Sequence, residues 1–143
     1  MKILTIKIFM TIVLVGMAAS CTTNNGDIGP LWGRWKVETM ECNGEQIAGY
    51  KGNIFFSFQN SVFMVLRVNE NIGQSGQYGV WSDEGDGMLV ISFPDERYKP
   101  FEELHFSQER NVLTYDKVDS KGFALTLHAP DGNTYIYHLV KWK

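Results

Sequence analysis

After position 31 the chain alternates between short apolar runs and turn-forming residues, and this alternation constrains the fold more than any other sequence feature. Eight runs rich in Val, Ile, Phe, Tyr and Trp are separated by Gly, Asn and Asp at the spacing of strands and hairpin turns. The expected strands are 32–41, 53–59, 62–69, 77–82, 88–93, 112–119, 123–129 and 133–142. This pattern indicates an all-β sandwich or barrel. Because eight antiparallel strands tend to close on themselves, we predict an eight-stranded antiparallel up-and-down barrel.

Size and composition agree with a single domain. The chain has 143 residues, of which 44% are hydrophobic and 20% charged, which suffices for one packed core. The connection 94–111, PDERYKPFEELHFSQERN, is the one long gap between expected strands. In it, Phe101, Leu104 and His105 would share one face of a short helix, or residues 104–107 would form a strand stub.

The last hairpin has a register that its turn predicts. The segment APDGN places Pro130, Asp131 and Gly132 at the positions of a type I turn with a G1 bulge, where Gly132 has positive φ. Three cross-strand pairs would then share the inner face: Phe123 with Leu139, Leu125 with Tyr137, and Leu127 with Tyr135. The preceding turn, DSKG, would add three more inward residues, Leu113, Tyr115 and Lys117.

Several tyrosines are among the residues expected to face inward. A wholly dry core seldom contains several tyrosines, because each buried hydroxyl needs a partner. Around a cavity they would present rings to an apolar ligand and hydroxyls to its polar end, whereas at the rims their hydroxyls would reach solvent. We expect the following side chains to line a ligand-binding cavity: Phe56, Phe58, Tyr78, Leu89, Ile91, Tyr115, Phe123, Tyr135 and Tyr137.

The first and last strands carry the residues that suggest a family. Gly33 and Trp35 form a Gly-x-Trp motif at the entry of the first strand, and the last strand ends YIYHLVKW. With eight strands in meander order, the chain resembles the lipocalin-like superfamily, in particular the small lipocalin-like lipoproteins of Bacteroides-type bacteria. The resemblance implies that Trp35 closes one end of the barrel and that Lys141 lies against its ring. Lipocalins usually have arginine at that place, so Lys141 departs from the family pattern.

The first 20 residues have the order of a secretory signal peptide. Lys2 and Lys7 precede an apolar run over 8–15 and small residues up to position 20. Cys21, directly after Ala-Ala-Ser, resembles the bacterial lipobox, although Ala18 stands where leucine is usual. The resemblance implies cleavage before Cys21 and its acylation, which holds the protein to a membrane leaflet. The alternative is an ordinary secreted protein with an unmodified Cys21.

These features divide the chain into three parts. They are a signal peptide over 1–20 that is removed, a lipidated Cys21 with a flexible linker over 21–30, and a barrel domain over 31–143. Cleavage removes two lysines and changes the formal net charge from −3 to −5. The linker has a single acidic residue, Asp27, whereas surface-exported lipoproteins of Bacteroides-like bacteria tend to carry an acidic cluster there. We therefore expect an outer-membrane lipoprotein of the cell envelope that faces the periplasm.

Motifs for catalysis, metal binding and nucleic-acid binding are lacking in the sequence. Basic residues are scattered singly, which argues against a nucleic-acid interface. His128 and His138 would be separated along the last hairpin, away from zinc-ligand geometry, and the third histidine is His105. The segment DEGDG at 83–87 lacks the ligand spacing of a calcium loop, and no nucleophile or phosphate-loop motif occurs. We expect no catalytic residue, no metal, no cofactor and no enzymatic activity, and a half-buried structural role for Cys42.

The run SVFMVLRV at 61–68 is apolar on both faces. Phe63 and Val65 lie on one face, and the other carries Val62, Met64, Leu66 and Val68. The preceding turn permits two registers, so either face could point inward. Apolar side chains then remain outside the barrel in both cases, where the connection 94–111, a second subunit or a membrane surface would cover them. Of these, we expect the connection.

Three functions are compatible with these observations. The leading hypothesis is a lipid-anchored envelope protein whose barrel binds a small hydrophobic or amphipathic ligand. The second is a protein-interaction or inhibitor module with a filled barrel, whose protein partner the sequence does not identify. The third and weakest is an enzyme that uses the cavity. An open aromatic cavity would favour the first, and a filled interior the second.

Overall fold

The computed structural model describes residues 29–71 and 73–143. The expected signal peptide, Cys21 and all but the last two residues of the linker lie outside the described residues. Within them the strands are β1 Gly33–Cys42, β2 Glu45–Gln46, β3 Ile54–Gln59, β4 Val62–Asn69, β5 Gly73–Gly85, β6 Met88–Ser92, β7 Asn111–Tyr115, β8 Gly122–His128 and β9 Thr134–Lys141. A short 3₁₀ helix, η1, spans Glu102–Leu104. No helix in this part of the chain has the length and apolar character needed to cross a membrane.

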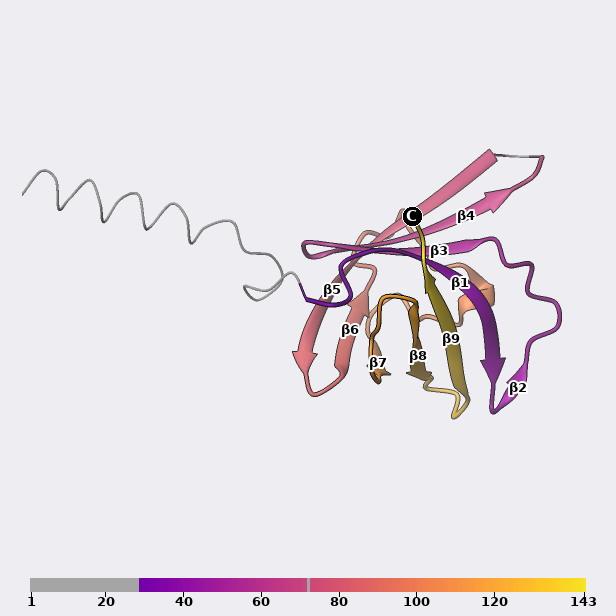
Figure 1. The fold of residues 1–143 in the computed structure, drawn as a ribbon. Helices are drawn as coiled ribbons and strands as arrows, with labels where there is room; N and C mark the ends of the chain where they lie inside the picture. Colours follow the sequence, from indigo (N-terminus) through magenta and orange to yellow (C-terminus); the bar gives the residue numbers. More distant parts are fainter. Residues whose placement is uncertain (1–28, 72) are drawn as a thin grey trace, which may run out of the picture.

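The strands form a closed antiparallel barrel. Each strand from β3 to β9 pairs with its neighbour in the sequence, β1 pairs with β3, and β9 returns to pair with β1, as in the register Trp35 to Lys141. Figure 1 shows β9 beside β1, with the C-terminus above them. The strand pair β1 and β2 adds only a two-residue extension at the end of β1. The predicted eight-stranded up-and-down barrel is therefore confirmed.

The register of the last hairpin is also as predicted. Phe123 pairs with Leu139, Leu125 with Tyr137 and Leu127 with Tyr135. Gly132 has a φ of 87°, and the Ala129 amide donates to the Asn133 carbonyl at 3.0 Å. The local turn sequence thus sets the pairing of two whole strands.

Two strands differ in length from their predictions. β5 begins at Gly73 rather than 77, because Asn69 of β4 pairs with Gly73 and extends the ladder through polar residues. β7 ends at Tyr115 rather than 119, because the Asp119 carboxylate accepts hydrogen bonds from the Lys121 and Gly122 amides and holds a turn. Lys117 lies beyond the strand and is exposed, so its placement on the inner side was wrong.

The hairpin between β3 and β4 decides which face of β4 points inward. Gln59 pairs with Val62, so Phe63 and Val65 face Phe58 and Phe56 on the inner side, and all four are fully buried. The other apolar face of β4, beginning with Val62, points outward.

The connection between β6 and β7 does not cover this outer face. It is a loop with the single helical turn η1, so of the two expected alternatives the structure has a short helix and no strand stub over 104–107. Leu104 and Phe106 turn into the barrel, where they are 0% and 9% exposed. Val62 and Val80 on the outer side remain 43% and 41% exposed, so the expectation that the connection covers them was wrong.

Candidate functional site

The closed end of the barrel is built on Trp35. Its ring is 2% exposed, packs edge-on against Phe123 at 4.7 Å, and donates from Nε1 to the Leu31 carbonyl at 2.8 Å. The Lys141 ammonium lies 4.3 Å from the ring centroid and donates to the Trp32 carbonyl at 2.9 Å. Burial lowers the pKa of Lys141. The indole of Trp32 itself is outside this end and 46% exposed.

Gly33 makes room for this lysine. Its φ is +118°, a conformation that side chains with a Cβ rarely adopt, and an added Cβ would lie 2.4 Å from Lys141 Nζ. The glycine, the indole and the ammonium group therefore form one closing unit at the end where β1 begins and β9 ends.

The barrel interior is filled by the chain's own aromatic side chains. Phe56 contacts Phe63, Phe106 and Tyr137, with centroid distances of 5.2, 6.0 and 5.7 Å. The Tyr137 hydroxyl donates to the Leu104 carbonyl, and burial raises the pKa of Tyr137. Phe106 and Leu104 of the connection thus occupy the space that an empty cavity would offer.

The residues expected to line a cavity have three placements. Seven lie in the packed interior: Phe56, Phe58, Leu89, Ile91, Phe123, Tyr135 and Tyr137. Tyr115 is half-buried near the closed end and donates to Asp83 at 2.9 Å, and its burial and this carboxylate raise its pKa to about 12. Tyr78 was wrongly expected to face inward. It is 46% exposed on the outer face, because Gly79 and Trp81 take the inward positions of β5.

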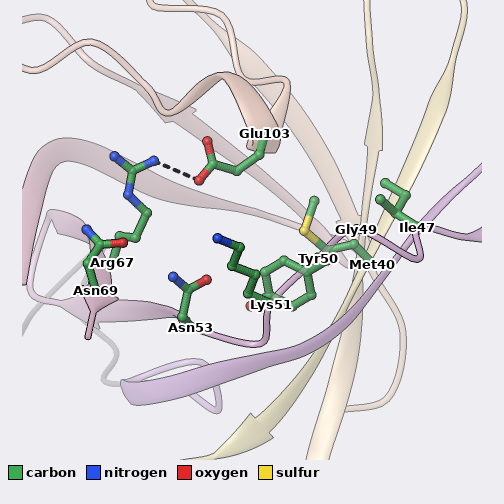
Figure 2. A pocket seen from close by; sticks show the side chains of 9 residues that line it. All are labelled: Met40, Ile47, Gly49, Tyr50, Lys51, Asn53, Arg67, Asn69 and Glu103. Atoms are coloured by element: carbon green, nitrogen blue, oxygen red, sulfur yellow. Dashed lines mark hydrogen bonds and ion pairs between the residues drawn. The ribbon is translucent and has the colours of Figure 1, made fainter. Parts of the chain in front are cut away.

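A cleft lies at the open end, opposite Trp35. It has a volume of about 340 Å³ and is formed by the end of β1, the loop after β2, the end of β4 and η1 (Figure 2). Its lining is Met40, Ile47, Gly49, Tyr50, Lys51, Asn53, Arg67, Asn69 and Glu103. Figure 2 shows Met40, Ile47 and Tyr50 toward one side and Arg67, Asn69 and Glu103 toward the other, so the cleft is apolar at one end and polar at the other.

The apolar side of the cleft is held by Tyr50. Its hydroxyl donates to the Val37 carbonyl at 2.6 Å and accepts from the Ile54 amide at 3.2 Å, which fixes the loop to β1 and β3. Burial raises the pKa of Tyr50 to about 12. Asn53 donates to the Val68 carbonyl at 2.9 Å and ties the same loop to β4.

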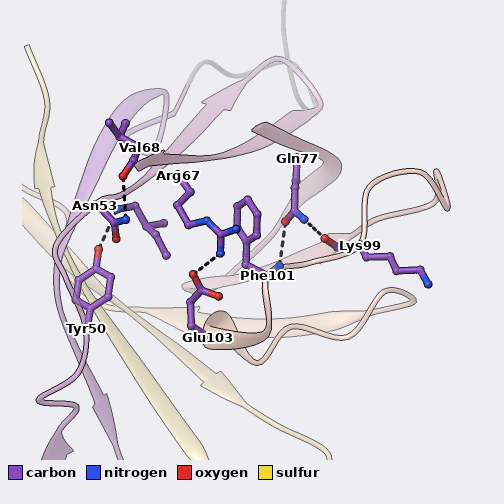
Figure 3. Close-up of polar contacts among 9 residues, drawn as sticks. Tyr50, Asn53, Arg67, Val68, Gln77, Lys99, Phe101 and Glu103 are labelled. Carbon is purple, nitrogen blue, oxygen red and sulfur yellow. Dashed lines mark hydrogen bonds and ion pairs between the residues drawn. The ribbon is translucent and has the colours of Figure 1, made fainter. Parts of the chain in front are cut away.

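The polar side is organised by Arg67. Its guanidinium lies 4.0 Å from the centroid of the Phe101 ring, and Nη1 donates to Glu103 at 2.8 Å (Figure 3). Gln77 holds the same connection to β5, because it donates to the Lys99 carbonyl and accepts from the Phe101 amide at 3.0 Å. Arg67 is thus a preoriented cation between the barrel wall and η1.

Two buried polar atoms at this end have no hydrogen-bond partner among the described residues. They are Arg67 Nε and Ser75 Oγ, on residues that are cross-strand partners in β4 and β5. An unsatisfied buried polar group costs about 1 to 3 kcal/mol, so such atoms in native proteins usually bind water or a ligand. These two atoms can therefore still form hydrogen bonds with water or a ligand beside the cleft.

The histidines and carboxylates of the described residues do not come together as a metal site. No group of three or more His, Cys, Asp or Glu side chains in residues 29–71 and 73–143 is placed to hold an ion. His138 is paired with Glu41 on the outer side, and His105 stacks on Tyr135 at 4.1 Å. Cys42 is half-buried at the end of β1.

Sequence reasoning missed the cleft residues. Tyr50, Lys51 and Asn53 lie in a loop without strand periodicity, and Glu103 reaches the cleft only through the fold of the connection. One signal was present: Arg67 is the single charge in the apolar run 61–68, at the inward parity of Phe63 and Val65. A charge at such a position indicates the rim of the barrel or a binding site, and Arg67 lies at the rim, where it lines the cleft.

Comparison with known proteins identifies the fold and the family. Residues 13–130 match the family described as lipocalin-like domain. A lipocalin-like protein from Bacteroides uniformis is similar in structure, with a TM-score of 0.60, 16% identity, and coverage of 80% of this chain and 100% of that one. An uncharacterized protein from Bacteroides eggerthii has a TM-score of 0.56 at 16% identity, covering 78% and 99%. None of the curated proteins compared matches significantly. Because the matched residues make up most of the chain and the barrel has the expected topology, the protein belongs to the lipocalin-like domain family.

Proposed function

We propose that this chain is a lipid-anchored protein of the cell envelope that binds a small amphipathic molecule in the cleft at the open end of its barrel, without catalysing a reaction. One observation carries the proposal: the cleft joins an apolar side to a preoriented cation whose Nε is buried without a hydrogen-bond partner among residues 29–71 and 73–143. Its volume of about 340 Å³ falls within the range of about 300 to 1,000 Å³ of small-molecule pockets.

The lining suggests how such a molecule would bind. Its apolar part would lie against Met40, Ile47 and the ring of Tyr50, and its polar group would reach Arg67 and Lys51. Two cations and one carboxylate, Glu103, leave the cleft with a net charge of one positive unit, so an anionic polar group is preferred. A carboxylate or phosphate could exchange with Glu103 for the Arg67 guanidinium, because both form charge-assisted hydrogen bonds with arginine.

The sequence supports the proposed anchor and location. Basic, apolar and small residues precede Cys21 in lipoprotein order, and acylation there would hold the barrel at the outer membrane, facing the periplasm. A ligand in that position would be a molecule of the envelope or one that crosses it.

A second candidate function is supported by the packed interior. Because Phe56, Phe58, Phe63 and Tyr137 are fully buried against one another, the barrel has the character of a solid scaffold. In this alternative the loops at the open end bind another envelope protein or inhibit an enzyme.

Native mass spectrometry of the protein purified from its own host tests the two candidates. We expect a retained small molecule that is lost in Arg67→Ala, because the variant removes the cation to which the polar group binds. Arg110→Ala, which removes an exposed arginine on the connection, is the matched control and should keep the molecule. A clean apo mass together with a stoichiometric protein partner would overturn small-molecule binding in favour of the interaction module.

A further inference from the structure

The outer side of the barrel has a wall that is apolar and carries no formal charge. We define the uncharged wall as the outward side chains of β3, β4 and β5 between Gly73 and Ser82. Its apolar members are Phe55, Val62, Met64, Leu66, Val68, Tyr78 and Val80. The remaining outward positions are Ser57, Gln59, Gln74, Gly76 and Ser82, so neither Asp, Glu, Lys nor Arg interrupts it.

Three large apolar side chains of the wall are strongly exposed. Val62, Tyr78 and Val80 are exposed by 43%, 46% and 41%, and Val62 and Val80 are direct cross-strand partners. Contiguous apolar surface of this kind marks an interaction site in soluble domains. The connection contacts the wall through Tyr98, whose ring packs on Tyr78 at 5.2 Å.

The edge of the wall near the closed end carries an indole and two cations. Trp142 is 48% exposed and packs edge-on against Phe55 at 5.0 Å. On β1, Lys36 is paired with Phe55 and Arg34 with Ser57, so both cations border the wall. The next exposed residue of β1, Glu38, is acidic, which confines the cationic border to the closed end.

We propose that the uncharged wall lies against the headgroup region of a phospholipid bilayer, with Trp142 at the interface and Arg34 and Lys36 on anionic headgroups. Trp and Tyr beside an apolar surface are typical of membrane interfaces, and lysine and arginine are attracted to anionic leaflets. The outside of a barrel is convex, so two such walls would touch along a narrow line, whereas a fluid bilayer conforms to the curvature.

The position of the tether supports a bilayer as the occupant, and this step rests on the proposed acylation of Cys21. Seven residues lie between Cys21 and Gly29, and the eight steps from one to the other extend at most about 28 Å. Two residues after Gly29, the Leu31 carbonyl accepts from Trp35, whose ring lies against Lys141, so the chain enters the body at the same end as Trp142. An anchored body would therefore be held within reach of the leaflet with its indole end nearest to it.

Quenching by brominated lipids tests the proposal on the mature protein reconstituted into vesicles of phosphatidylethanolamine and phosphatidylglycerol. We expect strong quenching of tryptophan fluorescence, most of which is lost in Trp142→Phe. Val80→Glu should reduce the quenching by at least half, because it places a charge at one of the most exposed apolar positions of the wall. Thr114→Glu, at an exposed outward position of β7 on another side of the barrel, is the matched control and should leave the quenching unchanged.

Other outcomes overturn the proposal. Equal quenching in Val80→Glu and Thr114→Glu would mean that the tether alone holds the protein at the vesicle. If the unsubstituted protein shows no quenching by lipid but forms a dimer that Val80→Glu disrupts, the wall binds a second copy of the chain. Failure of the anchor is detected separately, by the absence of acyl mass on Cys21. In that case the unacylated chain should still co-sediment with these vesicles. Lys36→Glu should weaken its binding to them about 25-fold, because the substitution changes the charge by two units and each unit near an anionic surface changes binding about fivefold.

Discussion

At the scale of single residues, the closed end depends on a glycine and a lysine that share one small space. Gly33 has positive φ, and a Cβ added to it would lie only 2.4 Å from the nitrogen of the Lys141 ammonium group. From there the ammonium reaches both the Trp35 ring and the Trp32 carbonyl. The family usually has arginine at this place, and the shorter lysine is accommodated because it donates to a main-chain oxygen.

Gly33→Ala should destabilise the barrel by about 1 to 3 kcal/mol, because the methyl group displaces Lys141 and the backbone conformation becomes strained. Urea unfolding followed by tryptophan fluorescence measures the change. Gly49→Ala is the control, since Gly49 has ordinary φ and nothing within 4 Å of its Cβ position, and it should change stability by less than about 0.5 kcal/mol. Equal effects of the two substitutions would contradict the close packing at Gly33.

At the scale of elements, the connection between β6 and β7 acts as part of the core. Phe106 lies 6.0 Å from Phe56, 5.5 Å from Tyr137 and 6.1 Å from Phe93. Asn111 holds the base of the connection, since its side chain donates to the Ile91 and Ser107 carbonyls. The connection therefore closes the interior at the open end and leaves the cleft around Tyr50 and Arg67 as the site above it.

Phe106→Ala should cost about 3 to 5 kcal/mol, because it removes a buried ring and leaves a cavity lined by aromatic side chains. The same variant should bind an apolar dye such as ANS more strongly at native conditions, since the cavity becomes accessible. Glu109→Ala, on the exposed part of the connection, should do neither. A loss of less than about 1 kcal/mol in Phe106→Ala would show that the segment contributes little to the core.

At the scale of the whole molecule, the barrel places tyrosines of very different exposure in one cooperative unit. Tyr137 is fully buried, Tyr50 and Tyr115 are partly buried, and Tyr78 lies on the outer wall. Burial raises the pKa of the first three, to about 12 for Tyr50 and Tyr115. The native state therefore keeps phenolic protons that the unfolded chain would release near pH 10.

The barrel should consequently lose stability as the pH rises above 10. Below that pH these tyrosines are neutral in both states and the stability is complete, whereas between pH 10 and 12 only the unfolded chain ionises. The buried Tyr137 contributes up to about 1.4 kcal/mol per pH unit, and the more exposed Tyr50 and Tyr115 contribute less. Urea unfolding at several pH values measures the slope.

Tyr137→Phe provides the comparison for this slope. It should lower stability at pH 8, because the Leu104 carbonyl loses its partner, and it should flatten the decline above pH 10. An unchanged slope in this variant would mean that Tyr137 titrates normally in the native barrel.

The sequence by itself determined the features that depend on neighbours along the chain. Period-two alternation and the glycine-containing turns set the strands, and Gly132 set the register of β8 and β9, because a turn fixes the pairing of the residues beside it. Family resemblance pointed to Trp35 and Lys141. Tyr78 was misplaced because the alternation of β5 puts Gly79 and Trp81 on the inner side, and Lys117 was misplaced because β7 ends at Tyr115.

Only the tertiary structure decided what fills the barrel and which surface remains outside. The inward turn of Leu104 and Phe106, the meeting of Tyr50, Arg67 and Glu103, and the outward face of Val62 and Val80 all join segments far apart in the sequence. Local propensity carries no information about such contacts. They form because closing β9 onto β1 leaves one interior of fixed volume. Side chains of the longest loop can fold into this interior, whereas the outward side chains of the uncharged wall point away from it.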